Sequence, residues 1–254
     1  MEVGFDGQVV VVTGGCRGIG RGIAQRFADA GAHVAICCRH EPESLPDGWL
    51  FVGADVREPD DVDAVIDRTR ERFGRIDVWV NNAGGSPPAD TATASPRFTA
   101  GIIALNLAAP IVCAQRANAV MQEQDGGGSI VNIASVSGVR ASPATLAYGA
   151  AKAGLLNATK TMAVEFAPKV RVNAVVVGLV LTEQAHLFYG DEEGTAAVGA
   201  TVPLGRMADP SDVADVCLFL ASPLARYVTG AEVLVHGGGE RPAYMDAAKG
   251  TRRP

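Results

Sequence analysis

The chain has 254 residues, of which 48% are hydrophobic and 20% charged, and it carries a formal net charge of −6. This composition excludes a disordered chain, and the negative charge argues against a nucleic-acid-binding protein, which usually carries a basic patch. No uninterrupted apolar run approaches the roughly 18–20 residues that span a bilayer, and the N-terminus lacks the features of a secretory signal. We therefore expect a cytoplasmic protein without nucleic-acid or membrane partners.

Short apolar runs rich in valine and isoleucine recur along the chain and predict strands that are buried on both faces of a parallel sheet. These runs are Gln8–Thr13, His33–Cys38, Trp49–Gly53, Ile76–Val80, Ser129–Ala134, Val170–Val177 and Glu232–His236. Segments with helical spacing of apolar residues lie between most of them. The alternation predicts a single-domain, Rossmann-type α/β fold, a doubly wound parallel sheet of about seven strands with helices on both faces. We assign residues 1–240 to this domain and residues 241–254 to a C-terminal extension.

Several boundaries can be predicted from local sequence. Pro59–Phe73 has the apolar spacing of a helix, and Gly74 follows where a helix C-cap is expected. Another helix is expected to begin after Asp209 and to end at Ser222. The segment 39–48, between the second and third strands, holds two prolines and a glycine and predicts a loop in place of a helix.

The five cysteines and four histidines do not suggest a metal site. The cysteines are odd in number and scattered, and none forms a C-x-x-C pair. This pattern predicts reduced thiols, as is usual in the cytoplasm. The histidines have no ligand spacing, so we predict no bound metal.

The first strand leads directly into a glycine-rich turn, Gly14-Gly-Cys-Arg-Gly-Ile-Gly20, which a helical pattern follows. A helix N-terminus offers free N–H groups and a favourable dipole to an anion, and glycines let a pyrophosphate approach the backbone closely. The spacing is G-x-x-x-G-x-G and not the more common G-x-G-x-x-G. An ordinary glycine turn is the alternative, but the preceding strand and following helix favour nucleotide binding.

Further motifs follow in a set order along the chain. They are Thr13-Gly14-x-x-x-Gly18-x-Gly20, Asp55-Val56, Asn81-Asn82-Ala83-Gly84, Asn106, Ser135, Tyr148-x-x-x-Lys152, and Gly178 with Thr182. Together they make the chain resemble the short-chain dehydrogenase/reductase family, classical type, over residues 5–240. The resemblance implies an oxidoreductase that interconverts a ketone and a secondary alcohol by hydride transfer with a nicotinamide cofactor.

The expected catalytic residues are Asn106, Ser135, Tyr148 and Lys152. Tyr148 and Lys152 are four residues apart and share a helix face, and a nearby ammonium should lower the pKa of the tyrosine. The resemblance implies that Tyr148 transfers the proton and that Lys152 also holds the nicotinamide ribose. Ser135, at a strand end, would donate to the substrate carbonyl, with Ser137 as a nearby competitor. Asn106 would position a water molecule that links Lys152 to solvent, although a buried, hydrogen-bonded core asparagine is the alternative.

The resemblance also implies a set of cofactor contacts along the carboxyl ends of the strands. Besides Tyr148 and Lys152, they are Gly14, Arg17, Gly18, Ile19, Gly20, Arg39, Asp55, Val56, Asn82, Ala83, Gly84, Gly178, Val180 and Thr182. Asp55 would bind the adenine amino group, Val180 the carboxamide through its backbone, and Thr182 the nicotinamide or phosphate end. Val177 stands where the family usually has proline, which leaves the shape of the loop after Gly178 open.

The end of the second strand bears on the choice of nicotinamide. A Rossmann strand at this position usually ends in an acidic residue when the ribose 2′-hydroxyl is bound, whereas arginine accommodates a 2′-phosphate. Here Cys38 stands at the acidic position, Arg39 follows it, and Arg17 adds a second cation. We therefore favour NADP(H) over NAD(H). Glu41 and Glu43 could weaken this preference, so an NAD(H)-dependent alcohol dehydrogenase is the alternative.

The substrate is expected to lie under three loops, Gly85–Pro96, Val136–Leu146 and Leu179–Val202. Leu187, Phe188 and Tyr189 form either a lid over an apolar ligand or a helix that packs on its own core. Because no Lys/Arg cluster stands near these loops, we expect a neutral hydrophobic carbonyl compound, steroid-like or cyclic, while a 3-ketoacyl thioester stays open.

The predicted fold is compatible with two other functions, and the resemblance also bears on the oligomeric state. The fold could serve a nucleotide-binding sensor without turnover, or an enzyme that performs epimerisation or dehydration with a bound nucleotide. The complete set of four catalytic residues argues against the sensor. The resemblance further implies a homotetramer, joined through the helices around Phe98–Met121 and Ala144–Phe166.

Overall fold

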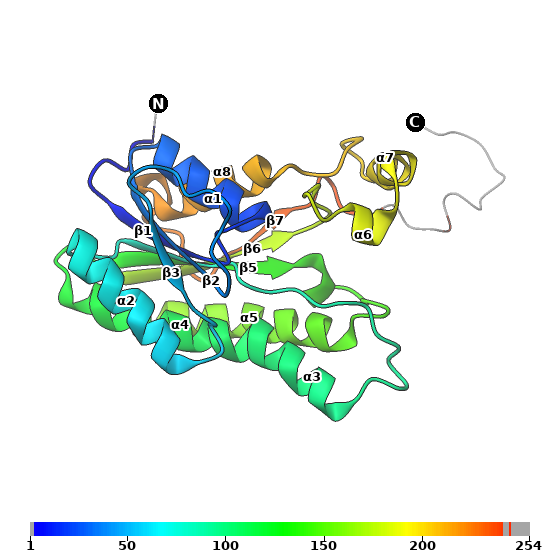
Figure 1. Ribbon diagram of the computed structural model, residues 1–254, viewed down its shortest axis with the longest axis horizontal. Helices are drawn as coiled ribbons and strands as arrows, with labels where there is room; N and C mark the ends of the chain where they lie inside the picture. The colour runs from blue at the N-terminus through cyan, green and yellow to red at the C-terminus, as the bar shows by residue number, and fades with distance from the viewer. Residues whose placement is uncertain (1–2, 241–243, 245–254) are drawn as a thin grey trace.

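The computed structural model describes residues 3–240 and residue 244, and a parallel sheet lies at its centre (Figure 1). Its seven strands run in the order β3-β2-β1-β4-β5-β6-β7, and every neighbouring pair is parallel. They are β1 (Val9–Thr13), β2 (His33–Cys38), β3 (Leu50–Gly53), β4 (Val78–Asn81), β5 (Gly128–Ser135), β6 (Val170–Val177) and β7 (Glu232–Val235). The order reverses between β1 and β4, and such a switch point opens a crevice at the carboxyl ends of the strands.

Helices cover both faces of the sheet, which confirms the predicted doubly wound α/β fold (Figure 1). On one face α1 packs against α8, and on the other α2 packs against α4 and α4 against α5. The helices are α1 (Gly18–Asp29), α2 (Pro59–Phe73), α3 (Pro96–Ile103), α4 (Ala109–Glu123), α5 (Leu146–Glu165), α6 (His186–Tyr189), α7 (Glu192–Thr201) and α8 (Pro210–Ala221). A π-helical segment, Ala104–Ala108, joins α3 to α4, and two short 3₁₀ turns span Val136–Gly138 and Pro223–Ala225. Short helices α6 and α7 lie beyond the carboxyl ends of β5 and β6.

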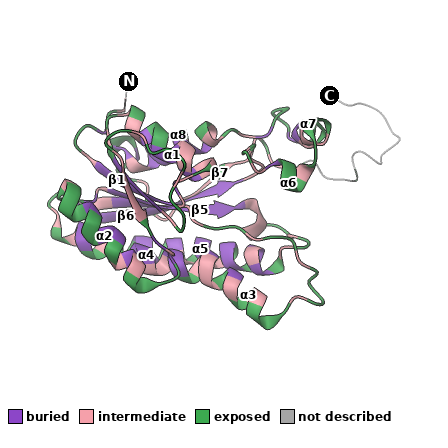
Figure 2. Cartoon of the chain, viewed as in Figure 1, coloured by how far each residue is buried: buried purple, intermediate pink, exposed green. Residues whose placement is uncertain are grey.

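Two hydrophobic cores explain why the strands are apolar at nearly every position (Figure 2). Successive side chains of a strand point to opposite faces of the sheet. Accordingly, Val11 joins the core beneath α2 and α4, whereas Val10 and Val12 join the core beneath α1 and α8. Trp79 of β4 is fully buried in the first of these cores.

Local sequence correctly predicted two helices and one loop. α2 has the predicted limits, and Gly74 beyond it adopts a left-handed conformation with φ of 83°. α8 starts after Asp209, which forms a reciprocal capping box with Asp212, and it ends before Ser222. The segment 39–48 contains no helix, as predicted from its prolines.

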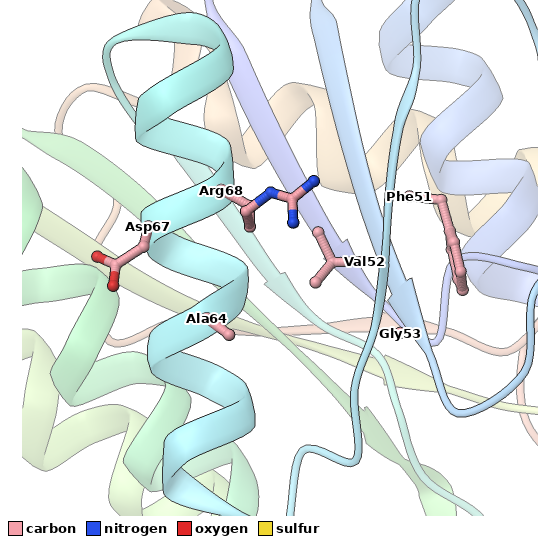
Figure 3. A pocket seen from close by; sticks show the side chains of 6 residues that line it. All are labelled: Phe51, Val52, Gly53, Ala64, Asp67 and Arg68. Carbon is pink, nitrogen blue, oxygen red and sulfur yellow. The ribbon is translucent and has the colours of Figure 1, made fainter.

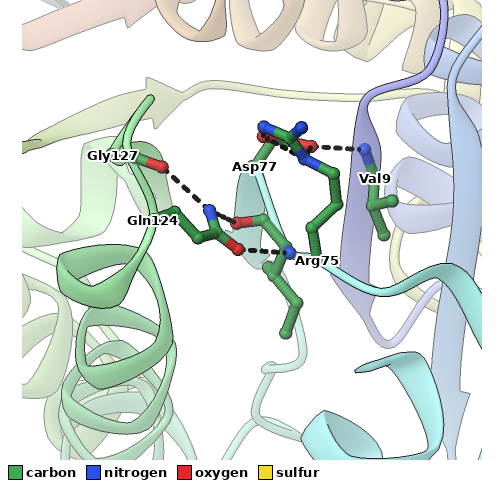
Figure 4. Close-up of polar contacts among 6 residues, drawn as sticks. Val9, Arg75, Asp77, Gln124 and Gly127 are labelled. Atoms are coloured by element: carbon green, nitrogen blue, oxygen red, sulfur yellow. Dashed lines mark hydrogen bonds and ion pairs between the residues drawn. The ribbon is translucent and has the colours of Figure 1, made fainter. Parts of the chain in front are cut away.

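The predicted strand Ile76–Val80 in fact begins at Val78, because a side chain replaces the strand ladder at Ile76 (Figure 4). The Gln124 amide accepts a hydrogen bond from the Ile76 N–H at 2.9 Å and donates to the Ile76 carbonyl at 2.8 Å. It also donates to the Gly127 carbonyl at 3.0 Å. Asp77 next to it accepts from the Val9 N–H at 2.8 Å. These contacts close the amino ends of the strands, opposite to the glycine-rich turn.

Gln124→Ala should therefore destabilise the protein. The change removes three hydrogen bonds and leaves part-buried backbone groups without partners, at a cost of about 1–3 kcal/mol. In a chain of this size each kcal/mol lowers Tm by about 2–4 °C, which differential scanning fluorimetry resolves. Gln25→Ala is the matched control, since Gln25 is exposed on α1 and bonds only to Asp29. Equal Tm values for the two variants would contradict the proposed closure.

The stretch Pro96–Glu123 is long and apolar enough to be a candidate membrane-spanning helix, since an 18-residue window within it has a mean hydropathy of 1.7. In the structure it is divided among α3, the π-helical segment and α4. Its buried residues, among them Asn106, Ala109 and Cys113, pack within the protein, and α4 contacts β4 and β5. We therefore interpret it as a core helix.

The structure corrects the prediction that the cysteines are reduced. Cys16 and Cys38 form a disulfide, although they are 22 residues apart in sequence. β1 and β2 are parallel neighbours, so the turn after β1 comes to lie beside the end of β2. Sequence spacing alone does not reveal this proximity. Cys37, Cys113 and Cys217 are free and buried.

Candidate active site

The glycine-rich turn is closely packed against its neighbours, which explains its composition. Gly14 has a φ of 64°, in the left-handed region that favours glycine. A Cβ on Gly20 would lie 2.3 Å from the Gly14 carbonyl oxygen and 2.4 Å from the Asn82 amide nitrogen. Thr13 Oγ1 accepts hydrogen bonds from the N–H groups of Asn82 and Ala83, each at 3.0 Å. The turn is thus tied to the loop that follows β4.

The N-terminus of α1 holds an acidic side chain from a distant part of the chain. Glu183 Oε1 accepts a hydrogen bond from the Gly18 N–H at 2.9 Å. Arg17 at the N-cap makes no capping hydrogen bond with its side chain, and the first turn has no acidic residue. A carboxylate therefore lies where a helix N-terminus binds anions, and this contact supports the predicted phosphate site. Thr182, a predicted cofactor contact, also approaches Gly18: a Cβ on the glycine would lie 3.5 Å from Thr182 Cγ2.

Ser135, Tyr148 and Lys152 meet at the carboxyl end of β5. Ser135 is the last residue of that strand, and Tyr148 and Lys152 lie in the first half of α5. Lys152 is only 3% exposed, and its Nζ donates a hydrogen bond to the Ile133 carbonyl at 2.8 Å. This burial lowers the pKa of Lys152 to about 8.

The pKa of Tyr148 is raised, whereas the sequence predicted a lowered value. Burial raises it, and the neighbouring Ser135 hydroxyl offsets this only in part. Lys152 Nζ lies 5.6 Å from the Tyr148 ring centroid and donates to a backbone carbonyl, so its ammonium does not favour the phenolate as predicted. Desolvation therefore dominates in this arrangement.

Asn106 lies fully buried in the π-helical segment. Its side chain donates to the carbonyls of Ile102, at 3.0 Å, and Gly85, at 2.9 Å, and accepts from the Gly85 N–H at 2.8 Å. A Cβ on Gly84 would lie 2.7 Å from Asn106 Oδ1 and 3.3 Å from Lys152 Nζ. The structure thus brings these residues together as predicted, and the asparagine positions the loop after β4. Its role toward a water molecule stays a prediction.

Asp55 lies just beyond the end of β3, where an adenine contact is expected. Arg57, which the sequence analysis missed, binds its carboxylate, with Nε 2.9 Å from Oδ1. This pairing lowers the pKa of Asp55, and the charge of Arg39 contributes to the same effect. Neighbouring Val56 packs its side chain into the core, so only its backbone can face a ligand. The i, i+2 spacing of Asp55 and Arg57 could have signalled the pair.

The loop after β6 is held in place despite the absence of the usual proline. Val177 pairs with Val235 in the ladder between β6 and β7. Val180, the predicted carboxamide contact, forms an isolated parallel bridge with Ala208. A Cβ on Gly178 would lie 2.7 Å from His236 Cβ, so glycine is needed there. These backbone contacts hold the loop after Gly178 in one shape, although Val177 replaces the usual proline.

A further depression lies away from the predicted site residues. A shallow depression between β3 and α2 is lined by Phe51, Val52, Gly53, Ala64, Asp67 and Arg68 (Figure 3). None of these is a predicted site residue. The lining contains no hydroxyl or imidazole side chain that could take part in acid–base chemistry. Within the described part of the chain, no group of three or more His, Cys, Asp or Glu side chains could hold a metal ion.

Comparisons with known proteins identify the family of this chain. A family model described as enoyl-(acyl carrier protein) reductase matches residues 14–240. An uncharacterised oxidoreductase of Mycobacterium tuberculosis is 35% identical, with 92% of each chain covered. The 3alpha-hydroxysteroid dehydrogenase of Mediterraneibacter gnavus is also 35% identical, over 91% of this chain and 96% of the relative. Among solved structures, ligand-free aldohexose dehydrogenase of Thermoplasma acidophilum superposes with a TM-score of 0.86 at 32% identity, covering 97% of both chains.

Proposed function

Since the chain belongs to the short-chain dehydrogenase/reductase family and is an oxidoreductase acting on alcohols and ketones, we propose that it reduces a hydrophobic ketone with NADP(H), reversibly. The observation that carries the proposal is the meeting of Ser135, Tyr148 and Lys152 beside an anion-binding turn. Such a site combines a proton donor, a hydrogen-bond donor for an oxyanion, and a cradle for a dinucleotide.

Each of the four site residues has a separate role in the proposed reaction. A bound nicotinamide supplies the hydride in reduction and accepts it in oxidation. Tyr148 donates its phenolic proton to the carbonyl oxygen, and Ser135 donates a hydrogen bond to the same oxygen, which stabilises the developing alkoxide. Lys152 offers its ammonium to the ribose hydroxyls. Asn106 acts through the backbone, since it holds Gly85 by two hydrogen bonds.

The residues at the adenosine end suit a phosphorylated ribose. Arg17, in the glycine-rich turn, and Arg39, directly after β2, are both exposed. The end of β2 has a cysteine, so no carboxylate is there to repel a 2′-phosphate. The experiment is a comparison of kcat/KM for NADPH and NADH, in wild type and in Arg39→Ala. We expect wild type to have a higher kcat/KM with NADPH than with NADH. Arg39→Ala should lower kcat/KM for NADPH and leave kcat/KM for NADH unchanged. A wild-type preference for NADH would overturn the assignment.

The substrate-facing side is apolar. In α6, Leu187 is 66% exposed and Phe188 is 59% exposed, so they do not pack into a core of their own. Val139 and Leu146, on the loop and first turn before Tyr148, are also exposed. These side chains favour the lid interpretation and a neutral hydrophobic substrate. A panel of a steroid ketone, a 3-ketoacyl thioester, a small diketone and a cyclic ketone, each assayed by NADPH oxidation, tests the substrate class.

Glu183→Gln should tighten cofactor binding. The Glu183 carboxylate competes with a pyrophosphate for the Gly18 N–H, and a charge at a helix N-terminus is worth about 0.3–1 kcal/mol, up to about 2. The dissociation constant for NADPH, measured by fluorescence titration, should fall by roughly two- to tenfold. Glu192→Gln is the control, because it removes the same single negative charge but does so in the first turn of α7. A weaker affinity in Glu183→Gln would mean that the carboxylate assists binding.

We extend the proposal to assembly and location. A homotetramer is favoured by apolar side chains left exposed on the surface helices, among them Val164 of α5, which is 79% exposed. We also place the protein in the cytoplasm and treat residues 1–240 as one catalytic domain. Light scattering at micromolar concentration tests the assembly, and a monomer peak would contradict it.

A further inference from the structure

A disulfide stands in the adenosine half of the crevice. Cys16 lies in the glycine-rich turn and Cys38 is the last residue of β2, with Cα atoms 6.4 Å apart. In Rossmann folds the end of the second strand is where a side chain meets the adenosine ribose. The bridge therefore joins the two backbone segments between which that ribose substituent must fit. Each cysteine is followed in the chain by an exposed arginine, Arg17 or Arg39.

These two sulfurs differ from the other three in their access to solvent. Cys16 and Cys38 are half-buried, whereas Cys37 and Cys113 are 1% exposed and Cys217 is fully buried. Burial raises the pKa of Cys37 to about 12 and raises those of Cys113 and Cys217 as well. Buried neutral thiols are inert. A thiol reagent in solution can thus reach only the paired sulfurs.

The surroundings of the pair suit reversible chemistry. The Cys16 N–H points at Cys38 Sγ at 3.1 Å and can stay hydrogen-bonded to that sulfur once the bond is broken. Cys16 Sγ lies 3.8 Å from the His40 carbonyl oxygen, which can accept a hydrogen bond from a reduced Cys16 thiol. Both forms of the pair therefore have partners in the existing fold.

We propose that Cys16 and Cys38 form a redox-modifiable pair in the cofactor site, whose disulfide form binds NADP(H) more weakly than its dithiol form. The inference rests on the proposed cofactor role of this crevice. In the disulfide neither sulfur carries a hydrogen, so neither can donate a hydrogen bond to a ribose phosphate. Reduction supplies two S–H donors and releases the turn from β2, because unbonded sulfurs must lie further apart.

The exchange balances with a small dithiol as reductant. One thiolate of the reductant attacks a protein sulfur, the Cys16–Cys38 bond breaks, and a mixed disulfide forms. The second thiolate of the reductant then displaces the protein sulfur and closes the reductant into its own disulfide. Two electrons and two protons thereby pass to Cys16 and Cys38. In reverse, a peroxide oxidises one thiolate to a sulfenic acid, which condenses with the other thiol and releases water.

Thiol counting and cofactor titration test the inference on the whole protein. Ellman's reagent should find no reactive thiol in peroxide-treated native protein, two after dithiothreitol is added and removed, and all five only after reduction and denaturation. Fluorescence titration with NADPH should give a dissociation constant about tenfold lower for the reduced protein, which corresponds to a hydrogen bond to a charged group. The probe 2′,5′-ADP should respond in the same direction.

Variants separate this inference from the proposed function. Cys16→Ser/Cys38→Ser should bind NADPH with reduced-like affinity under both treatments, whereas Cys113→Ala should keep the wild-type response. Equal NADPH affinity in oxidised and reduced wild type, or two reactive thiols that peroxide does not remove, would overturn the redox pair and leave the oxidoreductase intact. A protein that binds NADPH in neither state would instead overturn the proposed cofactor, and the redox inference with it.

Discussion

Tyr148→Phe is expected to lower kcat for ketone reduction by about 10²–10⁴-fold, the usual contribution of a positioned general acid. The change removes one oxygen atom and keeps the ring between β5 and α5, so the NADPH dissociation constant and Tm should stay at wild-type values. Initial rates of NADPH oxidation, with fluorescence titration beside them, measure both. Tyr227→Phe is the matched control, because Tyr227 is 99% exposed and lies outside the catalytic group. Turnover by Tyr148→Phe at a near-normal rate would exclude Tyr148 as the proton donor.

The raised pKa of Tyr148 gives the reaction a direction-dependent pH profile. Reduction needs the protonated phenol, which persists through neutral pH, so its rate should decline only in the alkaline range. Oxidation of the alcohol needs the phenolate, so its rate should rise with pH over the same range. Profiles of kcat in the two directions should therefore slope in opposite senses, and both slopes should vanish in the residual activity of Tyr148→Phe.

Lys152→Met should abolish turnover and, at the same time, stabilise the protein. The ammonium is buried with one hydrogen bond, to the Ile133 carbonyl, and its pKa falls from 10.5 to about 8. At about 1.4 kcal/mol per pKa unit, the folded state bears a penalty on the order of 3 kcal/mol while the lysine is charged. Methionine removes this penalty but loses the hydrogen bond, worth about 1 kcal/mol. The net gain should raise Tm by a few degrees, at about 2–4 °C per kcal/mol.

The pH dependence of that gain identifies its cause. Because the folded pKa lies below the unfolded value, the penalty is fully present below about pH 8 and fades as pH rises toward 10.5. The Tm difference between Lys152→Met and wild type should therefore shrink between pH 7 and pH 9.5. Lys160→Met serves as the control, since Lys160 is exposed on the same helix and its surface ion pair with Glu232 contributes little. A lower Tm for Lys152→Met at pH 7 would show that the lysine stabilises the fold.

The parts of the fold that follow from local chemistry were predictable, and those that depend on distant contacts were not. The central valine-rich strands are buried on both faces, so composition alone indicated a parallel sheet. Prolines and glycines marked the ends of α2 and α8. Ile76 was assigned to a strand because it is apolar, but Gln124, 48 residues away, satisfies its backbone. No local pattern reveals such a partner.

The candidate site divides in the same way. The motif around Tyr148 and Lys152 placed two groups on one helix face. It could not show that Lys152 donates to the Ile133 carbonyl, or that burial therefore raises the pKa of Tyr148. Glu183 reaches Gly18 across 165 residues, and the Cys16–Cys38 bond depends on the neighbouring positions of β1 and β2. These contacts arise only when separate βαβ units come together in one sheet.

The reversal of strand order between β1 and β4 also corresponds to a division along the chain, into a part before β4 and a part from β4 onward. Under the proposed function, residues 14–57 would face the adenosine end of the cofactor, whereas Ser135 and the described residues after it, up to residue 240, would face the reacting carbonyl. Recombination at a boundary near β4 could therefore exchange coenzyme preference without altering substrate choice. The two parts meet where Glu183 and Thr182 approach Gly18, and also where α1 packs against α8. A chimaera of two relatives would therefore have to match both the contact of Glu183 with Gly18 and the packing of α1 against α8.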